Sequence, residues 1–413
     1  MTKKSDAPAI RFKGFSDAWE QRKLSEITDK VTEKNAGLQY VETFTNSAEF
    51  GIISQRDFFD HDIAKLGSLD GYYIVKNEDF VYNPRISTSA PVGPINRNKL
   101  GRTGVMSPLY TVFRPHDIDT TYLEYFFKCG YWHSFMNFNG DSGARSDRFS
   151  IRDNVFFQMP IPIPDIDEQR KIGELLTCLD NLITLHQRKF EKLTNVKKSM
   201  LEKMFPQNGS SYPEIRFKGF TDPWEQRKLG DIGKARSGVG FPDADQGGLT
   251  GVPFFKVSDM NSDGNENEMT VANNYVTAEQ IADHRWSPIT ELPAIFFAKV
   301  GAAVMLNRKR LCRFPFLLDN NTMAYSLSPT KWDADFAKAL FGTVDLTSLV
   351  QVGALPSYNA GDVESMEIYL PSLLEQEQIG AYFNHLDNLI TLHQRELEKL
   401  QNIKKSMLEK MFV

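Results

Sequence analysis

Cysteine is scarce in this chain, with three residues among 413 (Cys129, Cys178 and Cys312) and no Cys-x-x-Cys pair. Such isolated cysteines argue against a disulfide framework and against a zinc ribbon. Long apolar runs are missing too, since none approaches the roughly 18 residues of a membrane span. The segment from Met1 to Asp6 is basic but lacks the apolar core of a signal peptide. We therefore expect a cytoplasmic protein with no membrane span and no metal site.

Three catalytic signatures are also absent. A nucleotide-driven motor needs Gly-x-x-x-x-Gly-Lys-Ser/Thr and a common kind of metal-dependent nuclease needs Glu-x-Lys, and the chain contains neither. A methyltransferase needs Asn/Asp-Pro-Pro-Tyr/Phe, of which Asn83-Pro-Arg85 is only a fragment. Gly238-Val-Gly240 does not continue as a dinucleotide-binding fingerprint. The sequence thus predicts no catalytic residue and no cofactor bound by this chain.

What the chain does contain is two sequences that each occur twice. The opening block, residues 10–27, returns at 215–232 with 14 of 18 residues unchanged, and the helix block, residues 179–205, returns at 386–412 with 23 of 27 unchanged. Between them lie two inserts, residues 28–160 and 233–368, which share little. Internal repeats define an architecture before any other signal does. One duplicated framework therefore presents two different surfaces.

Each helix block has the spacing of a coiled-coil seam, with apolar residues alternately four and three positions apart. No proline occurs between 165 and 205 or between 372 and 413, so each helix would run for about 38 residues, or roughly 57 Å. A helix this long with one apolar stripe needs a partner, and the nearest is its own duplicate. The expected seam residues are Leu179, Ile183, His186, Phe190, Leu193, Leu386, Ile390, His393, Leu397 and Leu400.

The short linker at 206–214, which contains proline, glycine and serine, favours an antiparallel helix pair with pseudo-twofold symmetry. A parallel pair would place both inserts at one end. His186 and His393 have no ligand partner three or four residues away, so we interpret them as interface residues and not as metal ligands. We expect Lys197 and Lys404, also on the seam, to extend toward solvent or a partner subunit.

The inserts are predicted to be α/β or α+β. Strand-like runs occur at 71–75, 79–82, 109–113, 294–297 and 323–327, and helices are plausible at 122–135 and 335–349. Both inserts end in proline-containing segments, 159–164 and 366–371, that suit an edge strand or connector. The predicted domain order is a first recognition domain (1–164), a helix (165–205), the linker (206–214), a second recognition domain (215–371) and a final helix (372–413).

Positive charge is segregated, although the formal net charge is −5. Two basic segments, 80–116 and 292–318, contain no aspartate or glutamate. Within them, residues 96–100 and 307–311 are expected to be basic loops at similar places in the two inserts. Arginine and lysine contact phosphates and read guanine, so these loops suggest nucleic acid. Polar clusters at 142–152 and 353–359 are a second candidate surface. The candidate residues are Arg85, Arg97, Lys99, Arg102, Arg145, Arg148, Arg152, Lys299, Arg308, Lys309, Arg310, Arg313, Ser357, Tyr358 and Asn359.

The whole chain resembles the specificity subunits of bacterial type I restriction-modification enzymes. The resemblance lies in the paired Phe-Lys-Gly-Phe-x-Asp-x-Trp-Glu-Gln-Arg-Lys-Leu blocks, the Pro-x-x-x-Glu-Gln-x-x-Ile segments at 164–172 and 371–379, and the Leu-Asp-Asn-Leu-Ile-Thr-Leu-His-Gln-Arg helices. It implies two target-recognition domains held apart by two helices, each domain reading one half of a bipartite, asymmetric site on double-stranded DNA.

The resemblance also implies partners. Two modification subunits would bring S-adenosylmethionine and the adenine methyltransferase site, and restriction subunits would bring ATP and Mg²⁺ chemistry with the nuclease. This chain would supply specificity alone. The alternative left open is a coiled-coil scaffold whose two domains bind a ligand other than DNA. Such a scaffold would lack the steep salt dependence that phosphate binding imposes.

Overall fold

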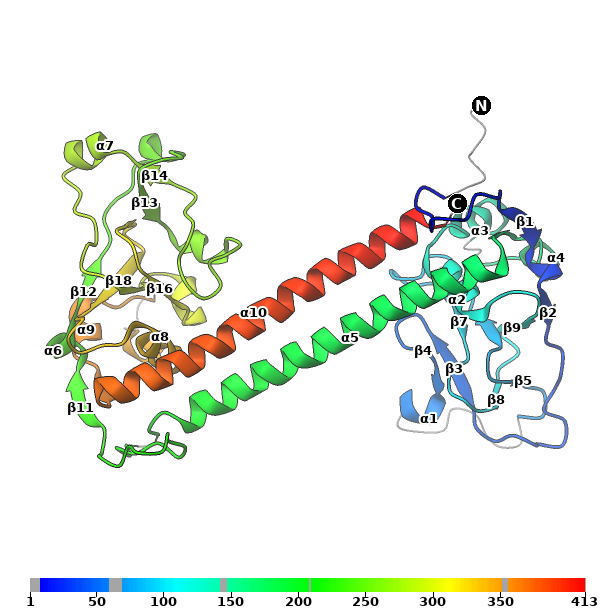
Figure 1. Ribbon diagram of the computed structural model, residues 1–413, viewed down its shortest axis with the longest axis horizontal. Coiled ribbons are helices and arrows are strands. Elements are labelled where there is room, and N and C mark those ends of the chain that lie inside the picture. Colours follow the sequence, from blue (N-terminus) through cyan, green and yellow to red (C-terminus); the bar gives the residue numbers. More distant parts are fainter. Residues whose placement is uncertain (1–7, 59–68, 142–146, 208, 351–355, 413) are drawn as a thin grey trace. The chain divides into compact units, whose positions relative to one another are not determined.

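The computed structural model describes residues 8–58, 69–141, 147–207, 209–350 and 356–412. The chain divides into two compact units, residues 1–185 with 396–413 and residues 186–395. Figure 1 shows the elements of each unit and the two long helices, α5 and α10. Within the described ranges, no helix is both long enough and apolar enough to cross a membrane.

The first unit is built on a four-stranded antiparallel sheet in the order β2-β9-β6-β7, with two-stranded sheets β1-β10, β3-β4 and β5-β8 around it. Its elements are β1 (Glu20–Lys23), β2 (Thr28–Lys30), β3 (Phe44–Ser47), β4 (Gly51–Ser54), α1 (Gln55–Phe58), β5 (Tyr73–Val75), β6 (Phe80–Tyr82), β7 (Ile95–Arg97), β8 (Gly104–Met106), β9 (Thr111–Pro115), α2 (Thr120–Lys128), α3 (His133–Asn139), α4 (Asp153–Phe156) and β10 (Pro160–Ile163).

The second unit repeats the main sheet as β12-β18-β15-β16 and adds a three-stranded sheet, β14-β13-β17, and the pair β11-β19. Its elements are β11 (Glu225–Lys228), α6 (Leu229–Ile232), β12 (Gly233–Ser237), β13 (Val252–Phe255), β14 (Tyr275–Val276), α7 (Ala278–Asp283), β15 (Ala294–Ala298), β16 (Lys309–Cys312), β17 (Leu317–Leu318), β18 (Thr322–Leu327), α8 (Ala334–Thr343), α9 (Ala360–Glu364) and β19 (Glu367–Leu370). The predicted mixed α/β class is confirmed, as are all five strand-like runs.

The two predicted insert helices are shorter than expected. The first ends at Lys128, because Gly130 takes a left-handed φ of 72° and the indole of Trp132 donates to the carbonyl of Phe127, and α3 then begins at His133. The second ends at Thr343, where Asp345 caps a short 3₁₀ turn over Leu346–Leu349. In both cases a local capping contact stops the helix before the apolar pattern does.

The opening blocks and the proline-containing connectors are partners. β1 pairs with β10 and β11 pairs with β19, each as a two-stranded antiparallel sheet, so the expected edge strands are confirmed. Arg11 and Arg216 then reach the first turn of the following long helix, where each makes a bidentate ion pair at 2.7 and 2.8 Å, with Glu168 and Glu375. The repeated opening block thus anchors the start of each helix.

Helices α5 (Ile166–Lys203) and α10 (Leu373–Lys410) have 38 residues each, as predicted. Their antiparallel pairing is visible in each unit taken alone. In the first unit Lys404, near the end of α10, pairs with Asp180 in the first half of α5. In the second unit Lys197, near the end of α5, pairs with Asp387 in the first half of α10, and His393 Nδ1 lies 3.1 Å from His186 Nδ1.

These contacts test the predictions for the seam histidines and for the seam lysines, with different outcomes. The histidines are interface residues, as expected. The expectation that Lys197 and Lys404 extend toward solvent is wrong, because antiparallel pairing brings an aspartate from the opposite helix to each ammonium group. Along the seam, Leu179 and Leu386 are buried, and the other expected positions are partly buried (Ile183, His186, Phe190, Leu193, Ile390, His393, Leu397 and Leu400).

The residues that directly follow each long helix enter a hydrophobic core. Phe205 packs on Trp224 and Phe383, with ring centroids 5.9 and 5.8 Å away, and Phe412 packs on Tyr122 at 5.5 Å. Trp19 and Trp224, which the two opening blocks share, are 4% and 2% exposed and pack in the cores. The end of α5 therefore completes the core of the second unit, and the end of α10 completes that of the first.

Phe412→Ala is expected to lower the free energy of unfolding by about 3–5 kcal/mol, because a fully packed aromatic ring leaves a cavity that the core cannot close. Chemical denaturation measures this loss. Phe138→Ala is the matched control, since Phe138 is 89% exposed. Equal stabilities for the two variants would contradict the docking of the helix end.

Candidate nucleic-acid interface

The expected basic loops at 96–100 and 307–311 are each partly strand, over residues 96–97 and 309–311. Asn96 and Arg97 belong to β7, and Lys309 and Arg310 to β16, and each of these is the last strand of its four-stranded sheet. The two segments do occupy equivalent places, as expected. The loop assignment holds for residues 98–100 and 307–308 and is wrong for the strand residues. Pairing with β6 and β15 depends on residues elsewhere in the chain, so a run of Arg, Lys and Asn does not indicate it.

Most candidate cations of the first basic segment are already neutralised. The Arg97 guanidinium lies 2.7 Å from Glu124 and 3.2 Å from Glu78, and Lys99 lies 3.3 Å from Glu124. Burial would raise the pKa of the Glu124 carboxyl, but Lys128, Arg97 and Lys99 together lower it below its ordinary value. Two further bidentate ion pairs join Arg102 to Glu42 and Arg114 to Asp79. These side chains hold the fold together.

Among the described candidates of the first unit, Arg85, Arg148 and Arg152 make no ion pair with a described residue, and the first two lie next to each other. Arg85 and Arg148 form an isolated antiparallel bridge, in which Ile86 N donates to Asp147 O at 3.0 Å and Phe149 N donates to Pro84 O at 2.7 Å. Both line a polar cleft of about 360 Å³. Arg85 is exposed and Arg148 is partly exposed. Arginines that border a cleft can donate to phosphate oxygens or to the O6 and N7 atoms of guanine.

Asn46 and Asn83 line this arginine cleft and belong to a network of amide hydrogen bonds. Asn46 donates to the carbonyl of Val81 at 2.7 Å, Asn83 donates to the carbonyl of Asn46 at 2.8 Å, and Asn96 donates to the side-chain oxygen of Asn46 at 2.7 Å. Because these donors are engaged within the protein, the network is rigid. Sequence reasoning missed Asn46, whose only signal is a polar residue inside a short strand.

The second unit has the same bridge with different side chains. Val300, three residues after Phe297 of β15, bridges Ser357, just as Arg85, three residues after Tyr82 of β6, bridges Arg148. Lys299 lies beside this bridge and makes no ion pair with a described residue. Tyr358 is buried and donates to the carbonyl of Ala298 at 2.6 Å, and burial raises the pKa of its hydroxyl.

The remaining candidates are scattered. Asn359 caps α9, and Arg152 is an exposed residue at the start of α4. Arg313 is held by Glu268 and Asp335, whereas Arg308, Lys309 and Arg310 line a separate cavity. Arg145 lies outside the described residues. No cluster of three or more His, Cys, Asp or Glu side chains suited to a metal ion occurs in the described part of the chain.

Comparison with known proteins agrees with this architecture. A family model for the type I restriction modification DNA specificity domain matches the chain twice, over residues 16–195 and 221–402. The MjaVIII type I restriction enzyme specificity subunit of Methanocaldococcus jannaschii is 23% identical over 279 residues, which is 62% of this chain and 61% of that protein. The putative MjaX specificity subunit of the same organism is 25% identical over 276 residues, 63% and 60% of the two chains. The matches span about three fifths of these relatives.

Two solved structures share the fold. The crystal structure of the type I restriction-modification S subunit from M. genitalium superposes with a TM-score of 0.60 over 98% of this chain and 99% of that one, at 13% identity. A chain from a study of complex assembly and conformational transition of the type I R-M system gives a TM-score of 0.50 at 13% identity, covering 96% and 98%. Since the family model matches most of the chain, this protein belongs to the type I restriction-modification DNA specificity family and carries the family's domain twice.

Proposed function

We propose that this chain is the DNA specificity subunit of a type I restriction-modification complex and that each unit reads one half of a bipartite, asymmetric site. The observation that carries this proposal is the repeated bridge: one scaffold position holds Arg85 and Arg148 in the first unit and Val300 and Ser357 in the second. Equivalent backbones with unlike side chains suit two unlike half-sites. The bases would be read by direct contact in the major groove, where guanine presents two acceptors to an arginine.

The paired helices are proposed to set the spacer of unread base pairs. Each is continuous for 38 residues, a length of roughly 57 Å at about 1.5 Å per residue, which exceeds one DNA turn of about 34 Å. In the first unit the Lys404–Asp180 ion pair fixes the local register of the two helices. In the second unit the Lys197–Asp387 ion pair and the histidine contact do so. A stiff element of fixed register suits the role of a ruler.

The partner subunits are proposed to perform the catalytic steps. We propose that modification subunits, carrying S-adenosylmethionine, dock on the outward faces of the helices, where Leu182, Leu185 and Leu392 are 37%, 46% and 52% exposed. Restriction subunits with ATP and Mg²⁺ would join that complex. The chain itself is proposed to perform no catalysis and to bind no cofactor.

Removing both cleft arginines tests DNA reading in the first unit. Arg85→Ala combined with Arg148→Ala is expected to weaken binding of the complex to its DNA site by about tenfold or more, because each arginine bound to a base or phosphate contributes about 1–3 kcal/mol. The plot of log K against log salt should also become shallower by about one unit for each phosphate that the variant no longer binds. Fluorescence anisotropy over a salt series measures both effects.

The matched control is Arg102→Ala, which removes an exposed arginine already paired with Glu42. Its DNA affinity should stay within about twofold of the parent, since surface ion pairs contribute little. Equal decreases in affinity for the control and the double variant would contradict the cleft as the reading surface. Salt-independent binding of the parent would instead favour the scaffold with a neutral ligand.

A further inference from the structure

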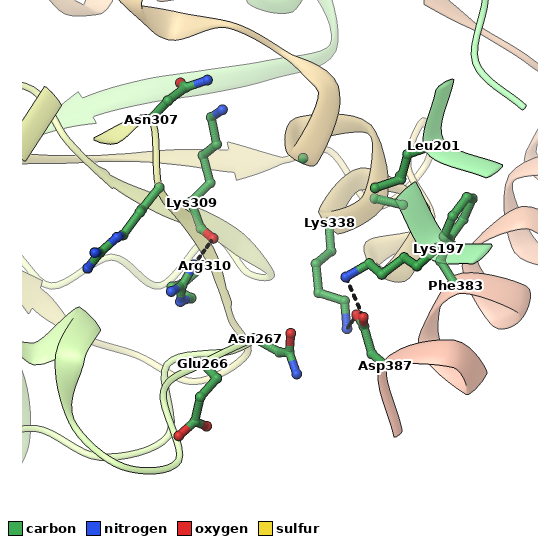
Figure 2. Close-up of a pocket in the computed structure, with 13 residues that line it drawn as sticks. Lys197, Leu201, Glu266, Asn267, Asn307, Lys309, Arg310, Lys338, Phe383 and Asp387 are labelled. Carbon is green, nitrogen blue, oxygen red and sulfur yellow. Dashed lines mark hydrogen bonds and ion pairs between the residues drawn. The ribbon is translucent and has the colours of Figure 1, made fainter. Parts of the chain in front are cut away.

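The second unit contains a cavity of about 300 Å³ where its sheet meets the helix pair. Figure 2 shows Lys309 and Arg310 of β16 on one side, and Lys338 of α8, Lys197 of α5 and Asp387 of α10 on the other. Arg308 completes the basic lining, and the carboxylates that line the cavity are Glu266 and Asp387. Five cations therefore border a space with two anions.

The helix side of this cavity is neutralised. Asp387 is shared by Lys197 and Lys338, and Lys338 also lies 3.4 Å from Glu268. The strand side is not. Within the described residues, no carboxylate forms an ion pair with Arg308, Lys309 or Arg310, and Glu266 instead accepts a hydrogen bond from Gly264 N at 2.9 Å.

The hydrogen bonds that the strand-side cations make with described residues go to neutral groups, although the Asp345 and Glu266 carboxylates act electrostatically on Lys309 and Arg310 from beyond ion-pair distance. Lys309 donates to the carbonyl of Val344, Arg310 donates to the carbonyls of Asn265 and Lys309 at 2.6 and 3.0 Å, and Arg308 donates to the Asn261 side chain. Lys309 and Arg310 are partly buried, and burial lowers the pKa of the Lys309 ammonium to about 8. Partly desolvated cations that make no ion pair are costly for a folded chain.

The first unit shows that the fold does not require these charges. Lys309 pairs with Phe297 in the second unit, and Ile95 pairs with Tyr82 at the equivalent place in the first. Ile95 is apolar and buried. Counted from the capping residues Asp119 and Asp333, Lys338 of α8 corresponds to Glu124 of α2. At two equivalent positions the second unit thus has lysines where the first has an apolar residue and an acid.

We propose that this cavity binds a phosphate group. Two guanidinium groups and an ammonium group on one wall match the oxygens of a phosphate, which accepts charge-assisted hydrogen bonds. The phosphate belongs either to a nucleic-acid backbone or to a free phosphate compound, and the site is independent of base reading by the arginine cleft. The rival explanation is that Lys309 merely caps the carboxyl end of α8 through the carbonyl of Val344.

The test uses the full chain and inorganic phosphate as the probe. At a concentration of about 100 times its Kd, phosphate should raise the Tm by about 3 °C or more, because a ligand that binds only the folded state stabilises it by mass action. Lys309→Met should weaken phosphate binding by about tenfold or more, since it removes a charged hydrogen-bond donor. Comparing each variant with and without phosphate removes any effect of the substitution on stability itself.

Lys331→Met, an exposed lysine of the same unit, is the matched control and should leave the phosphate response unchanged. Arg308→Gln, at an exposed position that lines the same cavity, provides a second test and should also weaken phosphate binding about tenfold. An absent phosphate response in the parent, or equal responses in all four proteins, would overturn the proposal and leave Lys309 as a capping residue.

Duplex DNA distinguishes the two sources. If DNA competes with phosphate and Lys309→Met weakens DNA binding, the cavity holds a backbone phosphate. If phosphate binds but DNA neither competes nor depends on Lys309, the ligand is a free phosphate compound. Failure of the parent complex to bind DNA sequence-specifically would refute the proposed function and leave the phosphate response standing, so the two failures are distinguishable.

Discussion

Exchanging residues 28–160 for the corresponding insert of a relative is expected to replace the first half-site and leave the second unchanged. These residues contain the sheet β2-β9-β6-β7 and the Arg85–Arg148 bridge, while the core of the second unit is built from other parts of the chain. Each correctly read base contributes about 1–3 kcal/mol of discrimination, so a new set of contacts should remove recognition of the old half-site altogether. Sequencing of methylated or selected DNA reports both half-sites at once.

The reciprocal exchange of residues 233–368 is the control for this chimera. It should change the second half-site alone, because its bridge of Val300 and Ser357 belongs to the other unit. Independent reading would be contradicted if either exchange altered both half-sites. A chimera that shows no DNA sequence preference would contradict independent reading only if its Tm shows that it is folded.

Lengthening the helix pair by two turns is expected to lengthen the unread spacer by about three base pairs. A seven-residue helical insert after Lys192 in α5, matched by one after Asn388 in α10, keeps the apolar spacing of the seam. Both inserts lie between the His186–His393 contact and the Lys197–Asp387 ion pair. Seven residues add about 10.5 Å, and one base pair spans about 3.4 Å.

The control for the longer helices is a seven-residue Gly/Ser insert at Ser210, in the linker after α5. It adds the same length of chain without lengthening a helix, so the spacer should keep its original length. Half-sites selected from a library of duplexes with spacers of different lengths measure both outcomes. An unchanged spacer in the helix variant would reject the ruler.

The helices and their pairing could be predicted because the sequence patterns that define them are local and occur twice. The seam spacing of Leu179, Ile183 and His186 and the absence of proline defined each helix, and the duplicate supplied the partner. The pairing of the opening block with the connector strand was not predicted, since β1 and β10 are more than 130 residues apart. Proline in the connectors indicated only that those segments lie at an edge.

The candidate site was harder to predict because its cations pair with carboxylates that lie far away in the sequence. Arg97 is a surface-binding candidate in the sequence, yet Glu124 on α2 neutralises it in the structure. Asp180 and Lys197 lie on the same helix. Only the antiparallel pairing shows that Asp180 pairs with Lys404 and Lys197 with Asp387. The Arg85–Arg148 bridge joins residues 63 positions apart in the sequence, and no sequence pattern predicts it.

A genome-wide map of methylated adenines, compared between cells with and without this chain in the presence of its modification subunits, tests the central claim most directly. The account predicts a motif that depends on the chain and consists of two dissimilar defined blocks separated by a fixed number of unread base pairs. A methylation pattern that is the same without the chain, or a single contiguous motif, would contradict it.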